Sequence, residues 1–255
     1  MRVMTFNLRL ATPVDGPNEW QYRKELVVET ILNCRPDLLG TQEGTVPQLE
    51  YLAAELSGYR PLIGHRQVDP TCQYPTIFYR AGIFQVSESN EFWLSETPTV
   101  HLSKSWGSAF PRLLTYGLFR EVNRDLPFYF LDTHLDNISP EARLRQGRMI
   151  GDFCQTRQQP VILAGDFNEP PEAPVYQELV GPGSPLRDSW RALHPPEDEV
   201  TTVHAFNGQP RGSGNRIDWI LATPPFAIRR AEIVTYNQGG RYPSDHFPYL
   251  AEVEY

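Results

Sequence analysis

Short apolar runs separated by polar breaks follow one another along the chain, and their spacing predicts alternating strands and helices at the start. Residues 2–8 alternate like a strand, and residues 37–43 form a second short apolar run. Between them, Leu26, Val27 and Ile31 recur at helical spacing, which predicts a helix over 19–34. Asn18 and Gln21 resemble a capping box at its start.

Beyond this point the pattern changes to consecutive strands. Thr45 and Pro47 open a second helix that Gly58 closes. A long aromatic-containing loop over 95–111 then interrupts the strands, and loops of this length are usually functional or disordered. We expect the remaining helices over 139–157 and 173–180, and strands over 74–80, 83–94, 113–122, 127–134, 160–166, 201–206, 215–222, 227–235 and 246–254.

Composition narrows the class of protein without deciding its function. The 255 residues carry a formal charge of −8, so a general duplex-binding protein, which needs a basic surface, is a poor expectation. No apolar run approaches the roughly 20 residues of a membrane span, and no signal peptide is visible. The three scattered cysteines predict buried free thiols. We expect one domain over residues 1–255, monomeric and cytoplasmic.

The stretch from Pro160 to Pro171 is the most informative part of the chain. Its apolar run is of strand length and ends at Gly165. Asp166 and Asn168 follow, two residues apart, so an extended chain would point both side chains to the same face. Such a pair can hold a phosphate, a water or a metal, although an Asx-rich turn after a strand is the better explanation when the pair is taken alone.

Similar polar residues stand at the ends of other predicted strands, where sites gather in layered α/β folds. The stretches are Thr5-Phe6-Asn7, Thr41-Gln42-Glu43, Asp132-Thr133-His134-Leu135, Gly165-Asp166-Phe167-Asn168, Arg216-Ile217-Asp218-Trp219-Ile220 and Ser244-Asp245-His246-Phe247-Pro248. Each has an ordinary explanation, such as a strand-end cap for Asn7 or a satisfied core histidine for His134. Asp218 is the hardest to explain in this way, because a carboxylate in an apolar strand is costly unless it is paired.

Together, in this order, these stretches resemble the endonuclease/exonuclease/phosphatase superfamily, which includes deoxyribonuclease I, abasic-site endonucleases and inositol phosphatases. The resemblance runs from the first strand to the last and implies an α/β (α+β) fold, a four-layer sandwich of two mixed β-sheets packed face to face and flanked by helices. A finer resemblance is to the deadenylase and nocturnin-like branch and its bacterial relatives. The stretches that carry it are Phe92-Trp93-Leu94-Ser95-Glu96-Thr97-Pro98, Phe110-Pro111-Arg112 and Thr202-Val203-His204-Ala205-Phe206.

The resemblance and the chemistry of phosphoester hydrolysis together imply a metal site. A hard cation with oxygen ligands neutralises the charge that develops on the phosphoryl group. Glu43 is the expected Mg²⁺ ligand, helped by Asn7 and Asp245, and Mn²⁺ could replace Mg²⁺.

The remaining roles follow on the same basis. Asp166 is expected to deprotonate or orient the attacking water, and Asn168 to donate hydrogen bonds to the phosphate or the nucleophile. His134 and His246 are expected to flank the phosphate as donors. Asp218 should hold one of these imidazoles in the useful tautomer, and the sequence leaves open which one. The candidate substrate-binding residues are Trp106, Arg112 and His204.

Three functions remain open at this point. The first is an Mg²⁺-dependent phosphodiesterase or nuclease-type hydrolase that acts by in-line attack of water, with single-stranded RNA, single-stranded DNA or a nucleotide as substrate. The second is a phosphomonoesterase of a small phosphorylated metabolite or lipid headgroup. The third is a non-enzymatic phosphate-binding module, which should lack a metal or base position, whereas this sequence has all of them.

Overall fold

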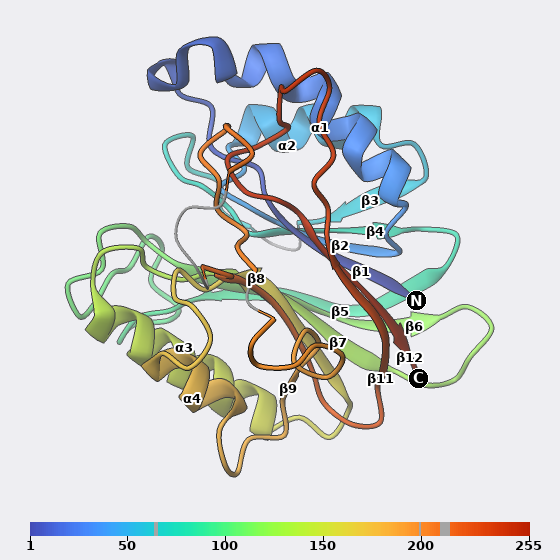
Figure 1. Ribbon diagram of the computed structural model, residues 1–255. Helices are drawn as coiled ribbons and strands as arrows, with labels where there is room; N and C mark the ends of the chain where they lie inside the picture. Colours follow the sequence, from blue (N-terminus) through green and yellow to red (C-terminus); the bar gives the residue numbers. More distant parts are fainter. Residues whose placement is uncertain (64–65, 199, 210–214) are drawn as a thin grey trace.

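Two six-stranded sheets face each other at the centre of the molecule, and helices cover the outer face of each (Figure 1). The structure is a computed structural model that describes residues 1–63, 66–198, 200–209 and 215–255. Helices α1 and α2 lie outside one sheet, and α3 and α4 lie outside the other. The four-layer sandwich of two mixed sheets is therefore confirmed.

The two sheets are built alike. The first has the order β11-β12-β1-β2-β4-β3 and the second the order β5-β6-β7-β8-β10-β9. In each, one central pair is parallel, β1 with β2 and β7 with β8, and the other pairs are antiparallel. The strands are β1 (Arg2–Asn7), β2 (Leu38–Gln42), β3 (Tyr59–Leu62), β4 (Thr76–Arg80), β5 (Phe84–Trp93), β6 (Leu113–Glu121), β7 (Phe128–His134), β8 (Val161–Asp166), β9 (Arg187–Asp188), β10 (Asp218–Ala222), β11 (Ala227–Ile233) and β12 (Tyr249–Glu254).

Local sequence signals set the ends of most helices. The helices are α1 (Trp20–Cys34), α2 (Val46–Glu55), α3 (Pro140–Gln155) and α4 (Pro174–Val180), and a 3-10 segment, η1 (Pro13–Asn18), precedes α1. Thr45 and Gln48 form a capping box at α2, and Ser139 caps α3 by accepting the N–H of Ala142. The capping box predicted at Asn18 is wrong, because Asn18 ends η1 and the residue before α1 is Glu19, which makes no side-chain cap.

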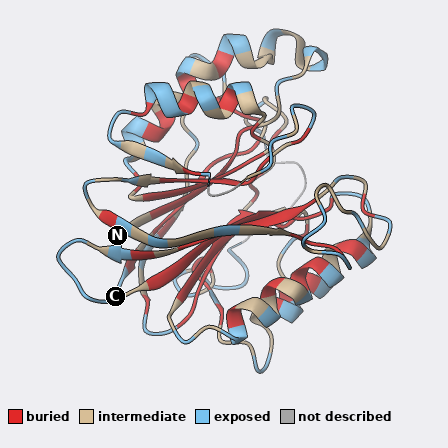
Figure 2. Cartoon of the chain, turned by 180° about the vertical axis from the view of Figure 1, so that it is seen from behind, coloured by how far each residue is buried: buried red, intermediate tan, exposed pale blue. Residues whose placement is uncertain are grey.

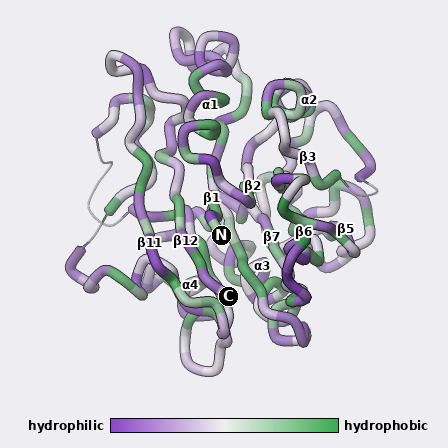
Figure 3. Tube along the Cα trace, turned by 90° about the vertical axis from the view of Figure 1, so that its right-hand side faces the viewer, coloured by the Kyte–Doolittle hydropathy of each residue, from purple (hydrophilic) through white to green (hydrophobic). Residues whose placement is uncertain are grey.

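The central strands are buried on both faces, which explains why their sequences are continuous apolar runs. In β8, Ile162 and Ala164 point to the core between the sheets, whereas Val161 and Leu163 point to the core under α3 and α4. Figure 2 shows the central strands largely buried, while the edge strands and the helices turn exposed residues outward. Figure 3 shows the same division, with hydrophobic stretches along the strands and hydrophilic residues in many outer turns.

Some predicted elements differ from the structure. The strand predicted over 201–206 is wrong, since only Val203 forms an isolated bridge, with His246. The edge strand β3 was not predicted because it contains Pro61, and proline is tolerated only at such edges. Cys72 and Cys154 are buried free thiols as expected, but Cys34 is only half-buried. In the described residues no helix is long and apolar enough to cross a membrane.

A buried carboxyl group links the two sheets. Asp132 of β7 is fully buried, and its Oδ1 accepts a hydrogen bond of 2.6 Å from Gln42 Nε2 of β2, which also bonds Thr5 Oγ1 of β1 at 3.0 Å. The other oxygen, Oδ2, has no partner among the described residues. Burial therefore raises the pKa of Asp132 well above its usual value, which keeps the group protonated as pH rises.

This raised pKa predicts a specific pH dependence of stability. Above about pH 4 the folded state retains a proton that the unfolded state has lost, so the free energy of unfolding falls as pH rises, by up to about 1.4 kcal/mol per pH unit. Asp132→Asn keeps the shape and cannot titrate. Urea unfolding of both proteins between pH 5 and pH 8 should show the wild type losing stability relative to the variant. A constant difference across this range would contradict the assignment.

Candidate active site

Three polar residues lie side by side on adjacent strands of the second sheet. His134 ends β7, Asp166 ends β8 and Asp218 begins β10. The register pairs His134 with Asp166 in the parallel ladder and Asp218 with Asp166 in the antiparallel one. Side chains paired in this way lie on the same face of a sheet, so the hydrophobic pattern that fixes the register also assembles this row.

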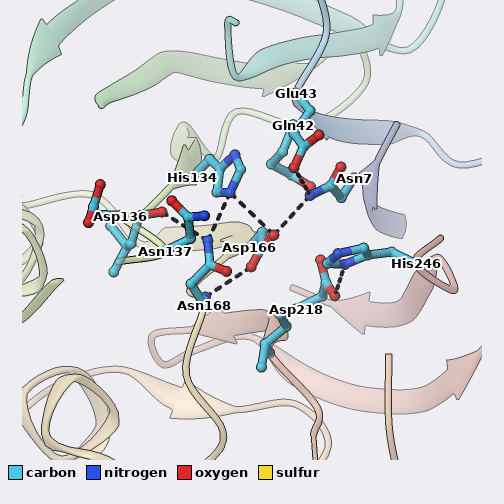
Figure 4. Close-up of polar contacts among 12 residues, drawn as sticks. Asn7, Gln42, Glu43, His134, Asp136, Asn137, Asp166, Asn168, Asp218 and His246 are labelled. Atoms are coloured by element: carbon cyan, nitrogen blue, oxygen red, sulfur yellow. Dashed lines mark hydrogen bonds and ion pairs between the residues drawn. The ribbon is translucent and has the colours of Figure 1, made fainter. Parts of the chain in front are cut away.

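The first sheet supplies two further groups from the facing edge (Figure 4). Asn7 ends β1, and its Nδ2 donates to Asp166 Oδ2 at 2.9 Å and to Glu43 Oε1 at 3.3 Å. Glu43 follows β2 directly and has a left-handed φ of 60°, which turns the chain sharply at this point. Its Oε2 accepts the backbone N–H of Leu10 at 2.9 Å. Asn7 thus connects the two carboxylates across the two sheets.

The histidine that Asp218 holds is His246. Asp218 Oδ2 lies 2.9 Å from His246 Nδ1, and both side chains are buried. Burial opposes a charged imidazole, but the paired Asp218 carboxylate outweighs this and raises the pKa of His246 well above its usual value. His246 is therefore a cation at neutral pH, with Nε2 protonated and free of any hydrogen bond among the described residues.

His134 has the opposite character. Asn168 Nδ2 donates to Leu135 O at 3.0 Å and lies 2.9 Å from His134 Nε2, which must then accept. Burial and the charge of Arg112 lower the pKa of His134 well below its usual value. The imidazole is neutral and holds the Asn168 amide in place, so the two predicted histidines differ in charge.

Asp166 lies at the centre of these contacts. It is 1% exposed, and besides Asn7 it accepts the backbone N–H of Asn168 at 2.9 Å. Burial and the nearby Asp218 carboxylate raise the pKa of Asp166 to about 7. The spacing of Asp166 and Asn168 therefore does bring both to one place, although Asn168 reaches it through a left-handed φ of 53° rather than an extended chain.

The oxygen-rich side of this site suits a hard divalent cation. Asp166, Asp218 and His246 each place one possible ligand atom within 4.8 Å of the others, and Asp218 Oδ1 is buried with no partner in the described part of the chain. A protonated imidazole does not bind metal, however, so the carboxylate of Glu43, which shares the Asn7 Nδ2 donor with Asp166, is the better ligand. The side-chain oxygen of Asn7 accepts the backbone N–H of Arg9 at 2.9 Å. The carboxylate of Asp245 accepts from Ser244 Oγ at 3.3 Å and lies 3.9 Å from Arg9 Nε.

The three candidate substrate-binding residues have different environments. Arg112 is buried, its Nη2 bonds Asn137 Oδ1 at 3.3 Å, and its Nε has no partner among the described residues. Trp106 is partly buried in the long loop, where its carbonyl accepts a hydrogen bond from Ser139 Oγ. His204 is fully buried and stacks on Phe247 at 3.9 Å, which is the position of a packed core side chain.

Asp136 is a residue of this region that the sequence reasoning missed. One carboxylate oxygen accepts from Ser108 Oγ and Ala109 N, and the other from Ile138 N and Ser139 N. Burial opposes the charge, yet these donors together lower the pKa of Asp136. The carboxylate thus ties the long loop to the start of α3. Its position three residues before the N-cap Ser139 was the one available signal.

The sequence profile of the endonuclease/exonuclease/phosphatase family matches residues 4–246. The chain belongs to this family. Members of the family hydrolyse phosphate esters, so the chain is a hydrolase acting on phosphate ester bonds. Enzymes of the family depend on a divalent metal, in agreement with the oxygen-rich site described above.

Individual relatives agree with this placement. The mannosyl-6-phosphatase of Bacteroides thetaiotaomicron is 29% identical, with all of both chains covered and a TM-score of 0.87. Nocturnin from Drosophila melanogaster is 25% identical over 92% of this chain and 42% of its own, so the chain spans about two fifths of that relative. The human nocturnin catalytic domain with bound sulfate shares the fold, with a TM-score of 0.75 at 21% identity, covering 100% of this chain and 93% of that one. The predicted resemblance to this family and its nocturnin-like branch is confirmed.

The contacts of Asp136 predict how the loop of this family member is held. Asp136→Ala removes five acceptor contacts, the longest of them to Phe110 N at 3.5 Å; a well-formed contact to a charged acceptor is worth about 1.5–3 kcal/mol. Amide hydrogen exchange at Ala109 should accelerate strongly, and the melting temperature should fall. Asp69→Ala is the matched control, because Asp69 accepts similar hydrogen bonds from Thr71 in an exposed turn. Equal exchange at Ala109 in Asp136→Ala and wild type would refute the anchoring role.

Proposed function

We propose that this enzyme is an Mg²⁺-dependent phosphoester hydrolase that works by in-line attack of water on phosphorus. The observation that carries the proposal is the contact of Asn7 with both Asp166 and Glu43, beside the charged His246 and the buried Arg112. A base, a metal ligand and two cationic donors thereby surround one small space where a phosphoryl group can lie.

The chain's own residues divide the reaction between them. Asp166 takes a proton from the attacking water while the water oxygen bonds to phosphorus. As the bond from phosphorus to the leaving oxygen breaks, that oxygen takes a proton from solvent water and departs as an alcohol. His246 Nε2 donates hydrogen bonds to the phosphoryl oxygens during this step, and Asp218 keeps its imidazole charged and oriented. His134 fixes the Asn168 amide and leaves the donor role to His246.

A divalent cation would complete the charge balance. Glu43 and Asn7 would hold it, and Asp245, the residue before His246, would be a further ligand. Bound there, it would neutralise the negative charge of the phosphoryl oxygens and favour the ionised form of Asp166. Mg²⁺ suits these oxygen ligands, and Mn²⁺ should substitute for it.

Two observations favour a small phosphomonoester over a phosphodiester as the substrate. Arg112 is a buried cation whose Nε has no partner within the described residues, and a monoester dianion has more charge for it to bind than a diester does. The net charge of −8 gives no general attraction for the flanking phosphates of a nucleic acid. The similarity to a mannosyl-6-phosphatase of the same length points the same way.

Two variants separate the metal site from the chemistry. Glu43→Gln should weaken Mn²⁺ binding, measured by calorimetry, by about tenfold or more, because it removes the charged ligand. Asp166→Asn should keep substrate binding but lower kcat by about 10²–10⁴, the usual contribution of a general base. Glu50→Gln, on the exposed side of α2, is the control for both. Wild-type Mn²⁺ affinity in Glu43→Gln, or a near-normal kcat in Asp166→Asn, would overturn the respective role.

Arg112→Met tests the phosphate-binding role against a structural one. Inorganic phosphate should inhibit the variant far more weakly, and KM for a sugar phosphate should rise by about tenfold or more, the loss expected for a charged hydrogen bond. The melting temperature should hold or increase, because burying an unpaired guanidinium is costly. Arg157→Met, which removes an arginine stacked on Phe153 away from the site, should leave KM unchanged. A lower melting temperature with normal KM would make Arg112 structural.

A further inference from the structure

Arg23 is a buried arginine outside the proposed chemistry. It lies in the first turn of α1 and is 2% exposed. Among the described residues it forms no ion pair with a carboxylate. Its guanidinium donates instead to four backbone carbonyls: Asn18 O (2.9 Å), Leu8 O (2.6 Å), Arg9 O (2.7 Å) and Pro243 O (2.9 Å).

Three of these four carbonyls belong to segments that hold predicted metal ligands. Leu8 and Arg9 directly follow Asn7, and Pro243 stands two residues before Asp245. The single nitrogen Nη1 bonds both Leu8 O and Pro243 O, although these residues are far apart in the sequence. The guanidinium therefore fixes the distance between the end of β1 and the segment that leads to Asp245 and His246.

Other contacts join the same segments around Arg23. Ser244 Oγ donates to Asn7 O at 2.7 Å. The ring of Phe206 covers the guanidinium at 5.5 Å and that of Trp20 at 5.2 Å. Ala205 N and His204 N both donate to Asp245 O, and Ala205 and Phe206 have left-handed φ values of 49° and 63°. Backbone strain of this kind persists only where surrounding contacts hold it.

We propose that Arg23 is a positioning residue for the divalent cation, which sets the separation of Asn7 from Asp245 without touching the ion or the substrate. This inference rests on the proposed function, since it takes the ligands from there. Lysine cannot replace Arg23, because its single nitrogen cannot bridge carbonyls from three segments in one plane. Burial lowers the pKa of Arg23 to about 10, which leaves the guanidinium charged at neutral pH.

The test is Mn²⁺ affinity, measured by calorimetry on the whole chain without substrate. Arg23→Lys should weaken Mn²⁺ binding by about tenfold or more, as loss of a group that orients metal ligands usually does. Raising Mn²⁺ should then restore much of the lost activity, since the reacting groups are intact.

Arg66→Lys is the matched control. Arg66 is also buried, stacks on Tyr74 and bonds Thr76, Pro75 and Thr115, none of them a predicted site residue. Both variants should lower the melting temperature, but Arg66→Lys should keep wild-type Mn²⁺ affinity. Equal weakening in the two variants, or unchanged affinity in Arg23→Lys, would overturn the inference.

Two further variants complete the design. If Arg23→Lys fails to fold, Ser244→Ala cuts the other link between the same segments and should also weaken Mn²⁺ binding; unchanged affinity there would overturn the inference. Glu43→Gln shows whether a negative result concerns the role of Arg23 or the metal site itself. Mn²⁺ binding that is lost in Glu43→Gln and kept in Arg23→Lys overturns only the role of Arg23. A wild type that binds no Mn²⁺ overturns the proposed metal site, and the role of Arg23 with it.

Discussion

The hydrogen bond from Asn7 to Asp166 depends on how the two sheets are stacked, and the rest of the site depends on it. Each sheet contains one parallel pair, β1 with β2 and β7 with β8, and Asn7 and Asp166 end strands of these two pairs. Because the carboxyl ends of both pairs reach the same edge of the sandwich, side chains 159 positions apart in sequence meet there. A second polar link, from Asp132 to Gln42 and Thr5, joins the same two pairs of strands between the sheets. Two separate links therefore fix the relative position of the two edges.

At this edge of the sandwich, neighbouring side chains of the same type have different electrostatic environments, and the two histidines differ in charge. Asp218 is the hydrogen-bonded partner of His246, whereas burial and the charge of Asp218 raise the pKa of Asp166. His246 is held charged by its partner, while His134, facing an amide and the charge of Arg112, is held neutral. Proximity and burial, not residue type, therefore decide which group can donate and which can accept a proton.

The ends of the predicted strands were the most informative positions in the sequence. Alternation and apolar runs located the strands, and polar residues at their ends located His134, Asp166 and Asp218, because the register that buries the core also aligns them. The partner of Asp218 could not be predicted, since His246 reaches it from a loop-borne segment rather than along a ladder. The strand expected over 201–206 failed for a related reason: His204 stacks on Phe247, Phe206 covers Arg23, and only Val203 pairs, in an isolated bridge. Asp136 and Arg23 act mainly through backbone groups, which leave little pattern in the sequence; for Asp136 the one signal is its position before the N-cap Ser139.

Arg23 and Arg112 show why the hydrogen-bond state of a buried residue is more informative than its type. Both are arginines with almost no exposed surface. Arg23 places its donors on four carbonyls, so its desolvation is compensated within the chain and it can only hold structure. Among the described residues Arg112 has one long hydrogen bond and an Nε without a partner, which leaves a cost that folding alone does not offset. Under the proposed function this cost is offset when the phosphoryl group of a substrate binds beside Asp166 and Glu43.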